Sequence, residues 1–190
     1  DLEVPDRNLY TFQAEIFGDA ERDGLWEYSY NRIYYYNTII EDVMNVEDVT
    51  LDKKRSLRAE ALLGRAFEYL TLVNAYANHY NKNTAATDPG VPLMLDKNIN
   101  KSNLERATVQ QVYDQILTDL DTAALYLPDK QKTAYRASKP VGLGMLARMY
   151  LYMGDYNEAL KYAKQSLAEN SSLLDLKNYS VVDPEKSIGR

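Results

Sequence analysis

The chain has 190 residues, with 22 lysines and arginines against 28 aspartates and glutamates, and its formal net charge is −6. This acidic balance argues against a dominant role in binding DNA or RNA, because phosphate backbones are bound by net basic surfaces. The chain has no cysteine, which excludes disulfides, thiolate nucleophiles and thiolate metal sites within these residues. No stretch reaches the roughly 20 apolar residues that a membrane-spanning helix needs.

Helical periodicity dominates the sequence. The 8 glycines and 6 prolines cluster between long periodic segments, a pattern typical of helices rather than of a β-sandwich or barrel. The predicted helices span about residues 25–46, 52–79, 108–127, 138–154 and 155–170. The segment before residue 25 has no decisive period, and a long connection over residues 80–107 is expected to pack as a defined excursion or to carry function. Residues 173–190 show no helical period and look like the end of a truncated part of a longer protein.

Capping signals mark the starts of the last three helices. Thr108 and Gln111 have the spacing of a capping box, in which each side chain bonds the backbone of the other residue. Pro140 is tolerated in the first turn of the next helix. Asp155 is expected to cap the last helix while Glu158 reaches back to it.

Residues 143–170 carry the clearest repeat signal. Bulky, small and aromatic residues recur there at the spacings of one tetratricopeptide repeat: Leu143, Leu146, Ala147, Tyr150, Gly154, Tyr156, Ala159 and Ala163. In this interpretation Gly154 turns the chain, and the alanines let two helices approach closely. Tyr150 and Tyr156 fill the space beside them.

A second helix pair follows the same rule. Leu63, Gly64 and Phe67 repeat the first-helix spacing, and their partner is expected in the helix around residues 112–127. We therefore predict an all-α, tetratricopeptide-like superhelix of five or more helices with one long loop, as a single domain over residues 1–190. The alternative is an ordinary helical bundle with one chance match.

Several strings occur in a distinctive order. They are Trp26, Tyr30, Ile33 and Asn37; then Arg58 to Ala61, Arg65, Ala66, Tyr69 and Leu70; then Gly90 to Leu93; then Arg106 to Val109, leading to Leu127 and Pro128; and last Ser138, Lys139, Ala147, Arg148 and Tyr150 to Tyr152. From about residue 25 to residue 179, their order and spacing resemble the SusD (RagB/SusD) family of the Bacteroidetes.

The resemblance implies a non-enzymatic surface lipoprotein of the outer membrane. Such a protein binds an oligosaccharide or another nutrient and sits as a lid on a SusC-like, TonB-dependent transporter. Family members are longer and carry a lipidated cysteine, so the implied membrane attachment is a lipid anchor that this sequence does not contain. The implied activity involves no cofactor and no nucleic acid.

Sugars present C–H patches and hydroxyl groups, so aromatic rings beside polar groups are the candidate binding residues. On the first long helix, one face is interpreted as core: Trp26, Tyr30, Ile33, Asn37, Ile40 and Met44. Tyr28 and Tyr35 fall on the opposite face with Arg32 at its edge, where they contact either sugar or, in the favoured interpretation, the transporter or another part of the protein. Tyr10 and Phe12 are further candidates; alternatively they form a small apolar cluster over the helices.

No catalytic residue or metal ligand is predicted. His79 is the only histidine and is interpreted as a capping or exposed residue. Asp119 and Glu158 are interpreted as solvated or capping. Two other functions remain open: a generic tetratricopeptide scaffold that binds a peptide, and a helical glycoside hydrolase, which would need two acids flanking a cleft.

Overall fold

A computed structural model describes residues 4–18, 22–101, 103–172 and 177. The predictions made for residues 173–190 lie outside these residues, apart from residue 177.

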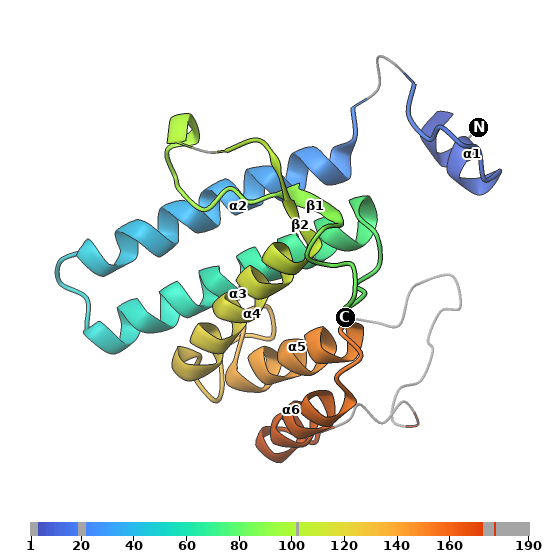
Figure 1. Ribbon diagram of the computed structural model, residues 1–190. Coiled ribbons are helices and arrows are strands. Elements are labelled where there is room, and N and C mark those ends of the chain that lie inside the picture. Colours follow the sequence, from blue (N-terminus) through green and yellow to red (C-terminus); the bar gives the residue numbers. More distant parts are fainter. Residues whose placement is uncertain (1–3, 19–21, 102, 173–176, 178–190) are drawn as a thin grey trace.

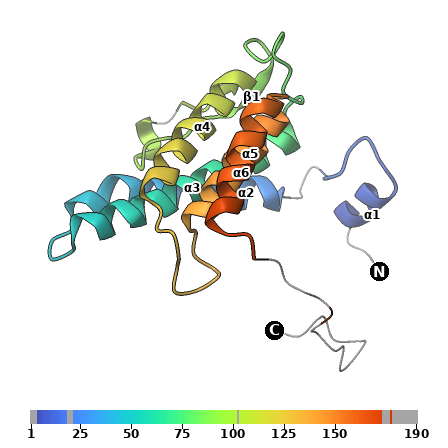
Figure 2. The ribbon, with the colours of Figure 1, turned by 90° about the horizontal axis from the view of Figure 1, so that it is seen from below.

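The described part of the chain is mainly helical, as predicted (Figure 1). Its α-helices are α1 (Val4–Tyr10), α2 (Gly24–Asp42), α3 (Leu51–Tyr76), α4 (Val109–Tyr126), α5 (Lys139–Tyr152) and α6 (Tyr156–Glu169), with short 3-10 turns η1 (Val43–Asn45) and η2 (Ile99–Lys101). The helices α2 to α6 pack in chain order, each against the next. The excursion between α3 and α4 does not separate these two helices, which pack directly against each other. In Figures 1 and 2, α1 lies apart from this stack.

The predicted capping signals operate with one exception. The Thr108 hydroxyl accepts a hydrogen bond from the Gln111 N–H at 3.2 Å, and the Gln111 side chain accepts one from the Thr108 N–H at 2.9 Å. The Asp155 carboxylate caps α6 by accepting from the Glu158 N–H. The Glu158 carboxylate does not reach back, because it pairs with Lys161 at 2.7 Å.

The long connection folds as a defined excursion, which confirms that expectation. It contains a two-stranded antiparallel sheet, β1 (Pro89–Pro92) and β2 (Arg106–Thr108). A side chain at Gly90 would lie 2.8 Å from the Ala107 carbonyl oxygen, so only glycine permits this close strand approach. Val91 is fully buried and attaches the sheet to the helical core.

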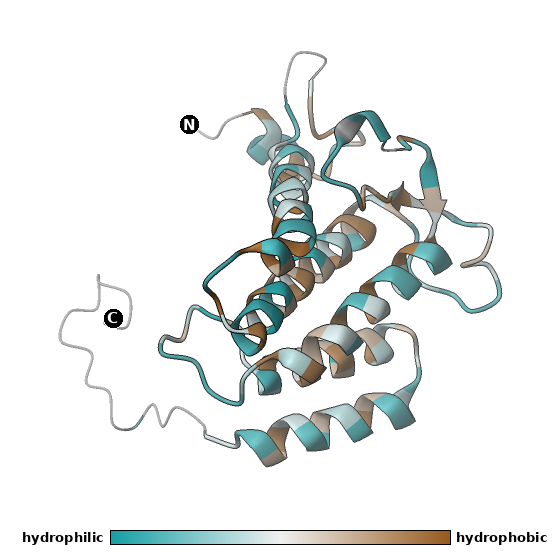
Figure 3. Ribbon diagram, turned by 90° about the vertical axis from the view of Figure 1, so that its left-hand side faces the viewer, coloured by the Kyte–Doolittle hydropathy of each residue, from teal (hydrophilic) through white to brown (hydrophobic). Residues whose placement is uncertain are grey.

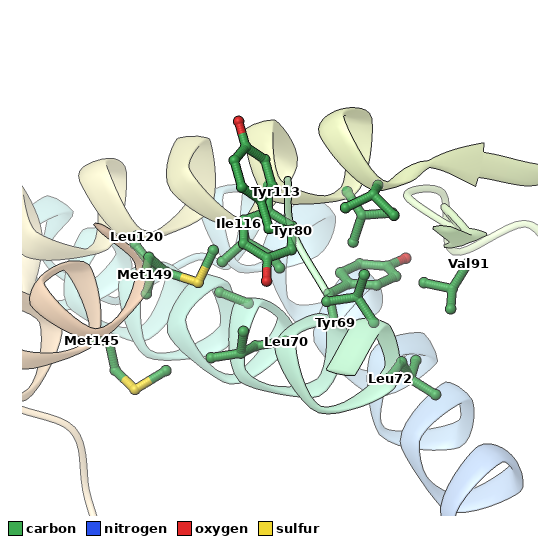
Figure 4. Close-up of a cluster of buried hydrophobic side chains, with 14 of the residues drawn as sticks. Tyr69, Leu70, Leu72, Tyr80, Val91, Tyr113, Ile116, Leu120, Met145 and Met149 are labelled. Atoms are coloured by element: carbon green, nitrogen blue, oxygen red, sulfur yellow. The ribbon is translucent and has the colours of Figure 1, made fainter. Parts of the chain in front are cut away.

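The main core lies between α3 and α4 (Figure 4). Tyr69 and Leu72 of α3 are fully buried there together with Ile116 of α4. Met145 and Met149 of α5 reach the same cluster, so α5, which packs against α4, extends this core. Burying each such side chain stabilises the fold by about 1.5–3 kcal/mol. Figure 3 shows the apolar residues concentrated where the helices face one another.

The last helix pair follows the repeat pattern except at one tyrosine. Gly154 makes the turn with a φ of +76°, a conformation that favours glycine. Tyr150 stacks on Tyr162, with ring centroids 5.4 Å apart. Tyr156 was expected to fill this space, but it is 71% exposed because, as the first residue of α6, it lies with Leu160 along the open groove between α5 and α6.

The expected core face of α2 is confirmed along most of its length. Ile33, Asn37 and Ile40 are buried, and Trp26 packs against the core. Met44 is exposed, because the α-helix ends before it and η1 changes the direction of the side chain.

Candidate ligand-binding surface

The outer face of α2 presents exposed tyrosines, as predicted. Tyr28 is 62% exposed and Tyr35 is 59% exposed, and their spacing of seven residues places them on one side of the helix. Tyr34 lies edge-on to Tyr35, with ring centroids 5.7 Å apart. We call Tyr28, Arg32 and Tyr35 the α2 tyrosine face.

Arg32 connects this face to α3. Its guanidinium donates from Nε to Oε1 of Glu68 at 2.6 Å and from Nη2 to Oε2 at 3.0 Å. The hydrogen bond to Glu68 raises the pKa of Arg32. Because Glu68 is buried and Arg32 is half exposed, the pair fixes a charged group between the two tyrosines with one side open to solvent.

Tyr10 and Phe12 lie elsewhere, at the end of α1 and just after it. Tyr10 is 78% exposed and Phe12 is 95% exposed. Phe12 has a φ of 53°, and Asn8 donates to the backbone carbonyls of Glu15 and Ile16, which stabilises the turn that presents the ring. Both rings are therefore available for contact, and the alternative that they form an apolar cluster over the helices is wrong.

A buried polar network inside the bundle was missed by sequence reasoning. Arg65 donates to both carboxylate oxygens of Asp119, at 2.8 and 2.7 Å, and to the Asn37 side chain at 2.9 Å. Asp119 is 2% exposed, so its interpretation as solvated or capping is wrong. The sequence did contain a signal for the burial of Asp119, because this residue shares the apolar face of α4 with Ile116 and Ala123.

The same network holds the excursion against the helices. The Tyr69 hydroxyl donates to the Met94 carbonyl and accepts from the Met94 N–H, both at 2.8 Å. Asn37 donates to the same carbonyl at 2.8 Å, and Tyr30 donates to the Pro92 carbonyl at 2.9 Å. These bonds supply partners for backbone groups at the end of β1 and just after it.

The described residues contain no group of three or more histidine, aspartate or glutamate side chains that could hold a metal ion. His79 is exposed just after α3. Within the same part of the chain, no helix combines the length and the apolar character needed to cross a bilayer.

The chain matches a protein family at the sequence level. Residues 6–151 match the SusD-like model described as "starch-binding associating with outer membrane". The SusD-like protein P2 of Formosa agariphila is 27% identical over 152 residues, which are 80% of this chain and 28% of that protein.

Solved structures share the fold. A SusD superfamily protein from Bacteroides fragilis superposes with a TM-score of 0.72 at 26% identity, over 84% of this chain and 37% of the other. A laminarin-binding SusD-like protein superposes with a TM-score of 0.65 at 23% identity, over 77% of this chain and 30% of the other.

Fold and sequence together define the class: a helical-repeat protein that matches a family model described as starch-binding and associating with the outer membrane. The chain belongs to the SusD-like family. It spans 28% to 37% of the length of the relatives just described.

Proposed function

We propose that this chain is the helical scaffold of a SusD-like nutrient-binding lipoprotein, which captures an oligosaccharide at the outer membrane and passes it to a SusC-like, TonB-dependent transporter. The family match over residues 6–151 carries this proposal. The protein acts by reversible binding rather than by turnover, and attachment to the membrane is through a lipid anchor.

Exposed aromatic residues divide between two roles in this proposal. Tyr10 and Phe12 stack on sugar, since rings on a turn can follow the faces of a glycan. The α2 tyrosine face contacts a protein partner, either the transporter or another part of the polypeptide. Tyrosine beside arginine is typical of protein interfaces, and Glu68 already holds Arg32 in one position.

Binding of a peptide by a generic helical scaffold is the second candidate. One observation favours it: an apolar groove of about 320 Å³ runs between α5 and α6. Ala147 and Leu151 line one side of this groove, and Leu160 and Ala163 line the other. A helix with an apolar stripe fits such a groove.

Calorimetric titration with neutral malto-oligosaccharides and laminari-oligosaccharides tests the first candidate. We expect heat of binding that is lost in a Tyr10→Ala, Phe12→Ala double variant and retained in Tyr156→Ala, a matched change at an exposed ring on α6. Tyr28→Ala with Tyr35→Ala is expected to leave sugar binding unchanged and to weaken copurification with the transporter. Binding that survives the Tyr10 and Phe12 changes would refute their role, and silence with all glycans would refute glycan capture by this chain.

Leu160→Glu separates the two candidates. It places a charge in the groove between α5 and α6, so it abolishes peptide binding if the groove is the site. The same change leaves glycan binding intact if the first proposal is correct.

A further inference from the structure

The N-terminal part of α3 carries four basic side chains close together. Lys53, Lys54, Arg55 and Arg58 all lie within the first two turns or so of α3. Among the described residues, none of the four forms an ion pair with a carboxylate. Lys54 instead donates to the Met44 carbonyl. Cations that no carboxylate neutralises can attract an anionic ligand.

Two of these cations border a cavity. A notch of about 120 Å³ lies between η1, α3 and α4, and it is lined by Met44, Arg55, Arg58, Ala59, Leu62, Thr122 and Tyr126. Ala59 and Leu62 are buried and form an apolar floor. One water occupies about 30 Å³, so the notch has room for an acidic group together with part of the ring that carries it.

The two guanidinium groups are positioned by different contacts. Arg55 lies over the Tyr126 ring, with its guanidinium carbon 5.4 Å from the ring centroid. Arg58 donates from Nε to the Ile40 carbonyl at 3.2 Å, and within the described part of the chain its terminal amino groups donate no hydrogen bond to protein. Guanidinium forks match the oxygens of carboxylates and sulfates.

We propose that this notch binds an acidic sugar residue, one that carries a carboxylate or a sulfate group, through Arg55, Arg58 and the ring of Tyr126. The apolar floor and the aromatic wall receive the C–H face of the sugar ring, and the arginines receive the anionic group. The net charge of −6 does not prevent this contact, because charges beyond about 8 Å are screened at physiological salt. The inference rests on the proposed function only for the ligand class, and it concerns a separate site.

Glucuronic acid and glucose form a matched pair of probes, since they differ at the acidic group. We expect glucuronate to shift the NMR signals of the Arg55 and Arg58 Nε–H groups and of the Tyr126 amide, while glucose does not. Arg55→Gln and Arg58→Gln should each raise the dissociation constant about tenfold, the loss expected for one charge-assisted hydrogen bond. Arg148→Gln, at an exposed arginine of α5, is the control and should change nothing.

Three outcomes would overturn the inference. The first is no shift with glucuronate at the notch. The second is an equal shift with inorganic sulfate that Tyr126→Leu does not weaken, since this would mean that the ring of the sugar contributes nothing. The third concerns lipid. If phosphatidylglycerol vesicles bind the wild-type protein but neither arginine variant, and glucuronate gives no shift, the notch binds lipid headgroups rather than sugar. Each leaves neutral-glycan binding, the test of the proposed function, unaffected.

Discussion

At the scale of single residues, the pair Arg65 and Asp119 shows what hydropathy alone misses. Both side chains lie in the middle of apolar helix faces, and each is buried. A charged residue on an apolar face is stable only when a partner compensates the cost of removing it from water. The helical period places each residue on the inner face, but the pairing depends on how α3 and α4 are aligned.

Removing one member of this pair should destabilise the protein strongly. In Asp119→Ala, the Arg65 guanidinium stays buried without its carboxylate, and we expect a loss of about 3–5 kcal/mol in the free energy of unfolding, measured by urea denaturation. Arg65→Met combined with Asp119→Leu should cost less than Asp119→Ala alone. This account would be contradicted if the double variant lost as much free energy of unfolding as Arg65→Met and Asp119→Leu lose together as single variants.

Two helical glycines should respond in opposite directions to alanine. A Cβ at Gly64 would lie 2.4 Å from the Tyr36 ring, whereas one at Gly144 would make only an ordinary contact, 3.6 Å from the Ser166 hydroxyl. Gly144→Ala should raise the free energy of unfolding by about 0.5–1 kcal/mol through helix propensity. Gly64→Ala should lower it by about 1–3 kcal/mol through overpacking.

A Tyr36→Ala background provides the control for Gly64. With the ring removed, Gly64→Ala should become stabilising in the same urea titration, because only its effect on helix propensity remains. If Gly64→Ala stays destabilising without the ring, the contact with Tyr36 is not the cause.

At the scale of elements, the excursion between α3 and α4 depends on side chains of the helices. Its backbone at the end of β1 and just after it, at Pro92 and Met94, is bonded to the side chains of Tyr30, Asn37 and Tyr69. The sequence predicts that this segment is ordered, from its length and its position between long helices. The bonding partners come from residues 25 to 62 positions away, and local sequence patterns do not encode such pairings.

Tyr69→Phe should loosen the excursion without unfolding the bundle. The change removes both hydrogen bonds to Met94, and we expect a loss of about 1–3 kcal/mol. Hydrogen exchange at the Met94 amide should accelerate about tenfold or more, since 1.4 kcal/mol corresponds to a factor of ten. Tyr80→Phe, which removes a bond to Gln110 instead, is the matched control. Equal acceleration at Met94 in both variants would contradict a local attachment.

At the scale of the whole molecule, buried tyrosines connect the stability of the bundle to pH. Burial raises the pKa of Tyr113 to about 12, and it also raises the pKa of Tyr69 above the usual value of 10.0. Above pH 10 the unfolded chain releases these protons while the folded protein retains them. The free energy of unfolding should therefore be unaffected by these groups below about pH 10 and fall as the pH rises towards 12.

Urea titrations between pH 8 and pH 12 measure this fall, within the alkaline range set by the tyrosine pKa values. Tyr113→Phe should reduce the slope above pH 10, because the substituted ring has no proton to lose. A slope that is identical in the wild-type and variant proteins would show that Tyr113 does not contribute.

The amino-acid sequence by itself determined the helices α2 to α6, the caps at Thr108 and Asp155, the repeat turn at Gly154 and the exposed face of Tyr28 and Tyr35, whereas the short helix α1 was not predicted. These features follow from short-range periodicity and backbone chemistry, which neighbouring residues specify. Only the tertiary structure decided that Asp119 is buried, that Tyr156 is exposed, and that Arg55 and Arg58 border one notch with Tyr126. Those outcomes depend on the alignment of helices far apart in the chain, because burial and pairing are properties of two surfaces together.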